Sequence, residues 1–560
     1  MTTGKTIFLP QIKRSLATEE LLSPAEVFDR FREDFEAIGI SDALATTMNN
    51  HPWALQRPIV ESCRLTFADY SSEEGSRAYI RTLALLLTAA ARELKLPTLK
   101  LEFALAKGYY GTIGDRRPTT EELERVRACI QRYIDADLPI NRVRLFAEEA
   151  IKYMEEKGDV DTAALISDSG RYSVVLWELQ GDYYYILHQV LARTGQLHLF
   201  DLEPANDGFL IRVPDRRDPT RLAERELQPK LFKALDSQHR LITGLSVEDV
   251  TPLNLLVRSG KTTQMIQVAE AQQEKQIAAI ASHIARLHRD KGVSAVLISG
   301  PSSSGKTTFS RRLTTQLLTH LIRPYPISLD DFYVNRAITP HNEAGQPDYE
   351  SVYALDLPFL RETLRGLVRG EEMPMPRYDF VLGERVMDPR NTLQLTEQDM
   401  IIIEGIHGLN PIILTDAVEA SSYKIYVSAL TAISYDKHNW LSTSDNRLLR
   451  RMVRDVKYRN KPPEETLTSW PDVRAGEEKW VFPYQEEADV IFNSAMVYEL
   501  GALRQQAELA ISRVPEMSPV YPLAARLLRE LRFFDPIPER RLPHGSLLRE
   551  FIGGSSYRDR

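Results

Sequence analysis

Short apolar runs separated by helical segments dominate the second half of the chain. Five runs, VSAVLIS, RPYPISL, DMIIIEG, YKIYVSA and ADVIFNS, are apolar along continuous stretches, and the sequence between them has helical spacing. Strands that are buried on both faces have this pattern, which is typical of a parallel sheet covered by helices. The pattern therefore predicts an α/β domain over residues 293–497.

The first half of the chain has a different pattern. Residues 75–97 and 119–139 have helical periodicity, and Thr119 with Glu122 forms a capping-box pattern, with Thr120 and Leu123 as the weaker register. Residues 172–213 are rich in β-branched and aromatic residues, which favours antiparallel strands. We therefore expect one α+β domain over residues 73–220, after a small α/β module over residues 1–72.

Two helical regions flank the predicted α/β domain. Apolar positions spaced three and four apart run from Thr262 to Gly292, and they predict a connecting helix within a linker over residues 221–292. Residues 498–560 are first helical and then rich in proline. This C-terminal helical tail ends in SLLREFIGGSSY, which could pack back onto a domain.

Composition and charge narrow the class of protein. The 560 residues are 43% hydrophobic, carry a formal net charge of −8 and include only two cysteines. This balance argues against a surface that attracts nucleic acid as a whole, and against a disulfide framework or a multi-thiolate zinc site. No run of about 18 uncharged apolar residues occurs and the N-terminus lacks a signal-like apolar run, so we expect a cytoplasmic protein with no membrane contact.

The clearest motif is GPSSSGKT, residues 300–307, which fits the pattern G-x-x-x-x-G-K-[ST]. It follows a predicted strand and opens a predicted helix, which is the context that a phosphate-binding P-loop requires. Inward-facing amides and the helix dipole would form an anion nest, Lys306 would reach the phosphates, and the Thr307 hydroxyl would ligate Mg²⁺. The predicted nucleotide-binding residues are Gly300, Ser302, Ser303, Ser304, Gly305, Lys306, Thr307 and Thr308.

Carboxylates follow two of the predicted strands. Asp330 and Asp331 come after RPYPISL, at the sheet edge where open α/β folds bind ligands, and one of them could accept the proton of an attacking hydroxyl. The alternative is that both only cap the next segment. Glu404 ends the run of three isoleucines, where a carboxylate commonly holds Mg²⁺ or its water.

A cluster of arginines lies in DNRLLRRMVRDVKYRNK, residues 445–461. Helical spacing puts Arg447, Arg450 or Arg451, and Arg454 on one face. Such a face could clamp the transferring phosphoryl group. A solvated basic face, or a patch for RNA, explains the same spacing equally well.

The order of these motifs resembles the uridine kinase and phosphoribulokinase family of P-loop kinases, over about residues 293–497. The resemblance implies that Asp330 is the general base, that Lys306 and Thr307 handle phosphate and metal, and that Glu404 supports the Mg²⁺ site. It also implies acceptor-side roles for Tyr333, Glu350, Tyr378 and Arg385, and lid roles for Arg451, Arg454 and Arg459, of which Arg451 and Arg454 join Asp330 and Lys306 in catalysis.

The chain departs from the uridine kinase pattern on the acceptor side. Gly383 stands nearest to the position of a base-contacting histidine, Ser469 stands near that of a glutamine, and Lys461 replaces an arginine. The expected function is ATP-dependent transfer of the γ-phosphoryl group to a hydroxyl of a nucleoside or a related small molecule. A sugar-phosphate or small-acid kinase, such as a phosphoribulokinase-like or glycerate kinase-like enzyme, remains the open alternative.

The N-terminal half resembles the front end of threonyl-tRNA synthetases: a ubiquitin-like module and then the second additional domain. The helix that carries a His-x-x-x-His pair in those enzymes has no histidine here, which points to a binding or regulatory scaffold instead of zinc-dependent hydrolysis. Chains that join this front end to a uridine kinase-like domain form a bacterial group that this sequence resembles. Two further possibilities stay open. The N-terminal half could bind RNA in an ATP-switched regulator, and the protein could form a homo-oligomer.

Overall fold

A five-stranded parallel sheet forms the centre of the second half, as the apolar runs predict. The computed structural model describes residues 4–114, 116–342, 345–379, 382–396, 398–414 and 416–557. The strand order is β14-β17-β13-β18-β19, and every neighbouring pair is parallel. The strands are β13 (Ala295–Ser299), β14 (Arg323–Ser328), β17 (Asp399–Glu404), β18 (Ser422–Ser428) and β19 (Val490–Asn493).

Helices cover both faces of this sheet, so the α/β fold is confirmed. Because side chains alternate along a strand, Val296 and Ile298 of β13 join one hydrophobic cluster and Leu297 joins another. Helices α9 (Thr262–Lys291) and α10 (Lys306–Thr319) contribute to the first cluster, and α11 (Leu357–Val368) contributes to the second. The remaining elements of this half are β15 (Met373–Asp379), β16 (Glu384–Leu393), α12 (Asp416–Ala420), α13 (Thr443–Tyr458), α14 (Pro463–Thr468) and α15 (Trp470–Trp480).

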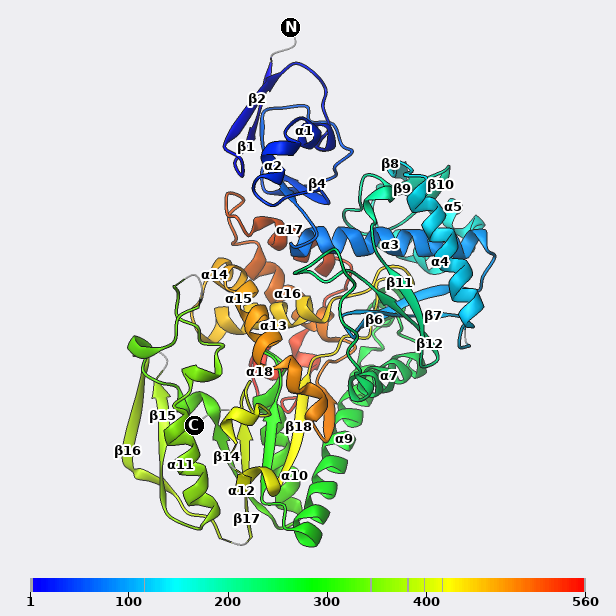
Figure 1. Ribbon diagram of the computed structural model, residues 1–560. Helices are drawn as coiled ribbons and strands as arrows, with labels where there is room; N and C mark the ends of the chain where they lie inside the picture. Colours follow the sequence, from blue (N-terminus) through cyan, green and yellow to red (C-terminus); the bar gives the residue numbers. More distant parts are fainter. Residues whose placement is uncertain are drawn as a thin grey trace.

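The long helix α9 is more than the connector that its sequence suggests. It lies beside α10 (Figure 1), and Arg312 of α10 donates a hydrogen bond of 2.7 Å from Nη2 to Glu274 Oε2 of α9. The helix ends at Lys291 and is capped by Gly292, whose φ of 71° is the left-handed conformation that favours glycine at a helix C-terminus. Helix α9 therefore belongs to the layer that covers the parallel sheet.

The first half contains three sheets. Strands β1 to β5 form a mixed sheet in the order β2-β1-β5-β3-β4, and the following strands form two antiparallel sheets, β11-β12-β7-β6 and β10-β9-β8. The predicted capping box is present, because Thr119 caps the N-terminus of α4 together with Glu122. No helix in the described part of the chain has the length and apolar content to cross a bilayer. The elements are β1 (Lys5–Leu9), β2 (Arg14–Thr18), α1 (Pro24–Arg30), α2 (Arg32–Glu36), β3 (Ala45–Met48), β4 (His51–Trp53), β5 (Cys63–Ala68), α3 (Glu73–Glu93), β6 (Leu99–Leu105), β7 (Gly108–Ile113), α4 (Thr120–Asp135), β8 (Asn141–Phe146), α5 (Ala147–Glu156), α6 (Val160–Asp168), β9 (Ser173–Leu179), β10 (Asp182–Tyr184), β11 (Asp201–Ala205), β12 (Gly208–Arg212), α7 (Pro229–Gly244) and α8 (Val250–Arg258).

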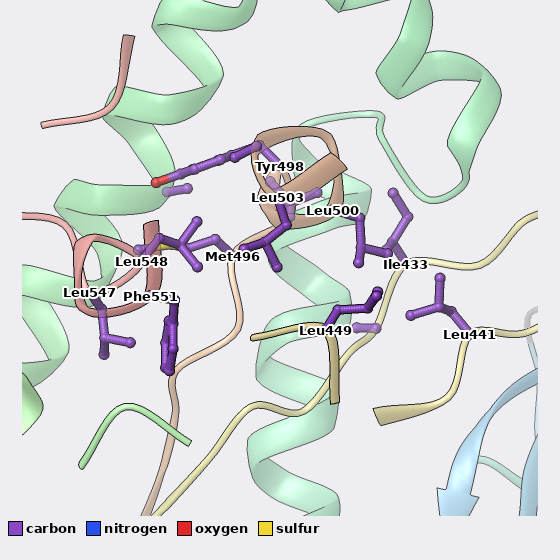
Figure 2. Packing of buried hydrophobic residues seen from close by; sticks show 14 of the residues in the cluster. Ile433, Leu441, Leu449, Met496, Tyr498, Leu500, Leu503, Leu547, Leu548 and Phe551 are labelled. Carbon is purple, nitrogen blue, oxygen red and sulfur yellow. The ribbon is translucent and has the colours of Figure 1, made fainter. Parts of the chain in front are cut away.

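The C-terminal tail lies between the two halves. Its helices are α16 (Glu499–Ile511), α17 (Tyr521–Leu531) and α18 (Arg549–Ile552), coloured orange to red in Figure 1. Figure 2 shows Leu500 and Leu503 of α16 in the same buried cluster as Leu449 of α13 and Phe551 of α18. Residues 547–552 are thus packed into the core, as their apolar side chains suggested.

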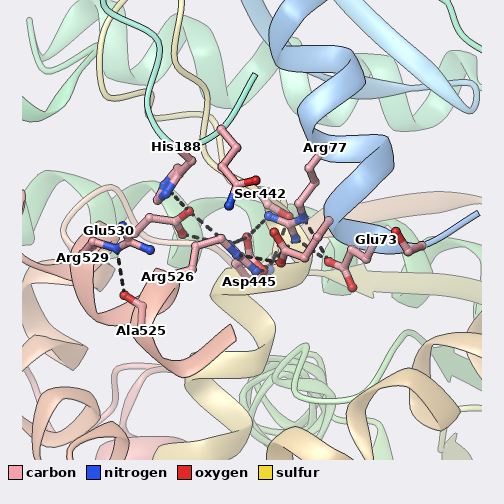
Figure 3. Close-up of polar contacts among 12 residues, drawn as sticks. Glu73, Arg77, His188, Ser442, Asp445, Ala525, Arg526, Arg529 and Glu530 are labelled. Atoms are coloured by element: carbon pink, nitrogen blue, oxygen red, sulfur yellow. Dashed lines mark hydrogen bonds and ion pairs between the residues drawn. The ribbon is translucent and has the colours of Figure 1, made fainter. Parts of the chain in front are cut away.

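A buried network of charges joins the tail, helix α13 and the first half (Figure 3). The Asp445 carboxylate, in the first turn of α13, accepts paired hydrogen bonds of 2.8 and 2.9 Å from Arg77 of α3. Arg526 of α17 donates a second pair, of 2.8 and 3.0 Å. Burial alone would raise the pKa of Asp445, but the two guanidinium groups hold that pKa well below its usual range. The start of α13 is therefore fixed by ionic contacts from both sides.

Candidate active site

The P-loop joins β13 to α10 at the carboxyl edge of the parallel sheet. Its backbone is tightly turned: Ser303 has a φ of 59° and Gly305 a φ of 86°, both in the left-handed region. A Cβ at Gly300 would lie 2.0 Å from the carbonyl oxygen of Val427, so only glycine fits beside β18 at this position. Glycine is thus favoured at position 300 by the close approach of β18, and at position 305 by the left-handed backbone conformation.

Amides of the loop bind carboxylates of this same chain. Helix α10 begins at Lys306, so its first N–H groups have no intrahelical acceptor. The Thr308 amide donates a 3.0 Å hydrogen bond to Glu550 Oε2, and the Ser302 amide donates one of 2.9 Å to Glu477 Oε1. The loop therefore has the anion-binding character that its sequence predicts.

Lys306 lies among carboxylates at the sheet edge. Its ammonium Nζ donates to the carbonyls of Gly300 and Pro301, at 2.9 and 3.1 Å. Burial lowers the pKa of Lys306, and the charges of Glu404 and Asp330 oppose this shift. Burial in turn raises the pKa of Glu404 to about 7, with Lys306 as the main opposing charge.

Thr307 and Glu404 are in direct contact. The Thr307 hydroxyl donates a 3.1 Å hydrogen bond to Glu404 Oε1. A hydroxyl and a carboxylate oxygen are suitable ligands for Mg²⁺, which proteins usually bind through one or two carboxylates together with substrate phosphates. The two residues predicted to hold the metal therefore fit that role in type and in position.

The two adjacent aspartates, Asp330 and Asp331, have different surroundings in the structure. They lie in a short 3₁₀ turn, Leu329–Phe332, directly after β14. Asp331 Oδ1 accepts a 3.1 Å hydrogen bond from the Tyr378 amide, so it holds strand β15. No hydrogen bond to the Asp330 carboxylate is found within the described ranges, and its charge acts on Lys306, Glu404 and Glu350. Asp331 therefore has the structural role, whereas the negative charge of Asp330 acts on the P-loop lysine.

Of the predicted acceptor-side residues, Tyr333 and Glu350 lie in the segment between β14 and α11, and Tyr378 and Arg385 lie in strands β15 and β16. The Tyr333 hydroxyl donates to the Tyr349 carbonyl at 3.1 Å, and the rings of Tyr333 and Tyr378 lie 5.8 Å apart. Burial raises the pKa of Glu350 to about 7, opposed mainly by Arg451. Arg385 is used differently, because its guanidinium is held by Asp356 Oδ2 at 2.7 Å.

Three lid arginines gather around the C-terminal half of α13. Arg451 Nη1 donates to the Ser302 hydroxyl at 2.6 Å, so it touches the P-loop. Arg454 and Arg459 instead approach Asp455 Oδ1, at 3.0 and 3.7 Å. The buried carboxylate of Asp455 thus holds the predicted lid cations close together.

The interpretation of α13 as a solvated basic face is wrong for two of its arginines. Arg447 and Arg450 are 2% and 0% exposed, and each pairs with a buried glutamate. Arg447 Nη2 lies 2.8 Å from Glu477 Oε2, and Arg450 Nη2 lies 2.6 Å from Glu499 Oε2. Both guanidinium groups also donate to P-loop carbonyls, of Ser302 and Ser303 respectively. These two side chains hold the P-loop in place.

Sequence reasoning missed three carboxylates: Asp455, Glu477 and Glu550. Two of them had a signal in the sequence. Glu477 follows Trp470 and Val473 at helical spacing, and Asp455 follows Leu448 and Met452 in the same way, so each is a charge on an apolar helix face. A charge at such a position needs a buried partner.

The parallel-sheet region matches a known family. Residues 295–500 match the family model described as Phosphoribulokinase / Uridine kinase family. A uridine kinase from Staphylococcus aureus (strain JH9) is 27% identical over 202 residues, which are 36% of this chain and 87% of that protein. The uridine kinase of strain Newman matches to the same extent. Residues 295–500 are therefore a domain of this family with kinase relatives, whereas the synthetase resemblance of the first half stays a prediction.

Three solved structures are similar to part of the chain. A putative fructose transport system kinase from Silicibacter sp. TM1040 has a TM-score of 0.28 and 18% identity, and it covers 39% of this chain and 98% of its own. A possible uridine kinase from Bacillus stearothermophilus has a TM-score of 0.26 and 19% identity, with coverages of 38% and 97%. A D-glycerate 3-kinase from Cryptococcus neoformans has a TM-score of 0.23 and 17% identity, with coverages of 48% and 96%.

The contact between Glu477 and the P-loop generates a stability prediction. Glu477→Gln leaves the buried Arg447 without a counter-charge, so we expect the free energy of unfolding of this domain to fall by about 3–5 kcal/mol. Glu478→Gln on the same helix is the matched control, because the Glu478 side chain is 45% exposed and its 3.6 Å pair with Arg474 should contribute less than about 1 kcal/mol. Thermal unfolding of both variants measures the difference. Equal unfolding midpoints would contradict the assigned role of Glu477.

Proposed function

We propose that the protein is a kinase that transfers the γ-phosphoryl group of ATP to a hydroxyl group of a small-molecule acceptor. The family domain over residues 295–500 supports the phosphotransferase class. The observation that carries the proposal is the shared carboxyl edge of three adjacent parallel strands: the P-loop follows β13, Glu404 ends β17 and Asp330 follows β14. A carboxylate base, a metal-holding carboxylate and a phosphate-binding cation are the parts that phosphoryl transfer needs.

The donor side is assigned to the P-loop. Amides of residues 300–308 bind the phosphates, and Lys306 neutralises charge on the β- and γ-phosphates. Thr307 and Glu404 are the residues that would hold Mg²⁺ with the nucleotide. When bound, the ion supplies neutralisation of phosphate charge.

The acceptor side is assigned to Asp330 and its neighbours. Asp330 accepts the proton of the acceptor hydroxyl as that oxygen attacks the γ-phosphorus in line, and ADP leaves. Tyr333, Glu350 and Tyr378 position the acceptor. Arg451, Arg454 and Arg459 close over the transferring group and exclude water, whereas Arg385 keeps the acceptor loop in shape through Asp356.

A nucleoside is the first candidate acceptor, since the curated relatives of this domain are uridine kinases. One observation favours a second class. At Gly383, the position nearest to the base-contacting histidine that the uridine kinase resemblance implies, a Cβ would lie 2.7 Å from Arg336 Cζ. The charge of Arg336 also acts on Tyr378. A cation at this position favours an acceptor with a phosphate or carboxylate group.

The assignment of Asp330 as the base predicts different effects for the two neighbouring aspartates. Asp330→Asn should lower kcat by about 10²- to 10⁴-fold, the usual contribution of a general base, with little change in KM for ATP. Asp331→Asn keeps an oxygen acceptor for the Tyr378 amide, so its turnover should stay near that of the unchanged protein. An assay that couples ADP release to NADH oxidation measures both. Equal turnover of the two variants would contradict the assignment of Asp330 as the general base.

An acceptor panel tests the function itself. ATP and Mg²⁺ are supplied with uridine, cytidine, ribulose 5-phosphate or glycerate, and phosphorylated product is measured by mass spectrometry. Arg336→Gln should raise KM by about 10- to 100-fold for an anionic acceptor, which loses a charge-assisted hydrogen bond, and should leave KM for a neutral nucleoside nearly unchanged. If no hydroxyl compound is phosphorylated, the kinase proposal fails.

A further inference from the structure

The last described segment of the chain, residues 546–557, packs directly against the P-loop. Leu547, Leu548 and Phe551 in this segment are fully buried. Figure 2 shows them beside Met496, which follows the last strand of the sheet. The guanidinium of Arg450, which also contacts the P-loop, lies 5.0 Å from the centre of the Phe551 ring. The segment is thus part of the core next to the loop.

Two contacts bring this segment into the anion nest. The Glu550 carboxylate accepts the hydrogen bond of the Thr308 amide at 3.0 Å. Leu547 lies over Gly305, where a Cβ would be only 2.2 Å from Leu547 Cδ2. Amides of a P-loop and of the helix that it opens cradle the α- and β-phosphates of a nucleotide. A carboxylate of this chain therefore lies where a phosphate would bind.

Polar contacts fix the same segment at both sides of the nucleotide site. Arg311 of α10 donates a hydrogen bond to the Tyr557 carbonyl, and Lys457 of α13 donates one to the Ile552 carbonyl. Gln506 of α16 adds a 3.3 Å hydrogen bond to the Ile552 carbonyl. The segment thus bridges the P-loop helix and the lid helix α13.

We propose that residues 546–557 are an autoinhibitory plug, in which Glu550 takes the place of a nucleotide phosphate and must withdraw before ATP binds. The proposal rests on the proposed function, because it assumes that the P-loop takes a nucleotide. Glu550 and a phosphate cannot both accept the Thr308 amide, and their like charges repel. The plugged form therefore lowers the apparent nucleotide affinity in proportion to its population.

Nucleotide binding to the full-length protein tests the plug. The probe is N-methylanthraniloyl-ADP with Mg²⁺, followed by fluorescence titration. Glu550→Gln keeps the side-chain shape but removes the charge, so this variant should bind the probe at least about tenfold more tightly. Tenfold is the expected change in apparent affinity if the plug of the unchanged protein is closed in about nine molecules out of ten. Glu516→Gln is the matched control on the same tail, because its side chain is 72% exposed, and its affinity should equal that of the unchanged protein. Hydrogen exchange of residues 546–557 should increase when the probe binds.

The outcomes separate the plug from the kinase proposal. Equal or weaker binding by Glu550→Gln, with unchanged exchange in residues 546–557, overturns the plug. The P-loop site itself still stands in that case if Lys306→Ala abolishes binding. Absence of binding in every variant, a deletion of residues 546–560 included, overturns the plug and the nucleotide site together.

Discussion

Charged side chains from three distant segments hold the P-loop in its shape. Glu477 accepts the Ser302 amide, Arg450 donates to the Ser303 carbonyl, and Glu550 accepts the Thr308 amide. Each buried backbone group left without a partner would cost about 1–3 kcal/mol. The loop conformation therefore depends on charged side chains from outside the loop, and in the proposed nucleotide-bound form a phosphate replaces Glu550 at the Thr308 amide.

Helix α13 contacts the P-loop, the first half of the chain and the C-terminal tail. Its middle holds the P-loop through Arg447 and Arg450, and at its C-terminal end the three arginines predicted to form a lid lie around Asp455. Its first turn is anchored by Asp445 to Arg77 of the first half and to Arg526 of the tail. Contacts from the tail, from the first half and from the P-loop therefore all converge on this one helix.

The sequence indicates the parallel sheet and the capping box of α4 because both signals are local: continuous apolar runs, and Thr119 three residues before Glu122. It indicates the meeting of the P-loop with Asp330 and Glu404 because carboxyl ends of parallel strands share one edge. The hairpin β15–β16 was not predicted, since prolines at positions 374 and 376 argue against a strand. The roles of Glu550 and Arg385 depend on partners that are distant in the sequence, and no spacing rule reports such contacts.

The central claim is that the P-loop holds a triphosphate whose terminal group faces Asp330. A crystal structure with Mg²⁺ and a non-hydrolysable ATP analogue tests it most directly. We expect the γ-phosphate between Lys306 and the Asp330 carboxylate, with Glu550 withdrawn from the Thr308 amide. An analogue bound away from residues 300–308, or an Asp330 carboxylate directed away from the γ-phosphate, would contradict it.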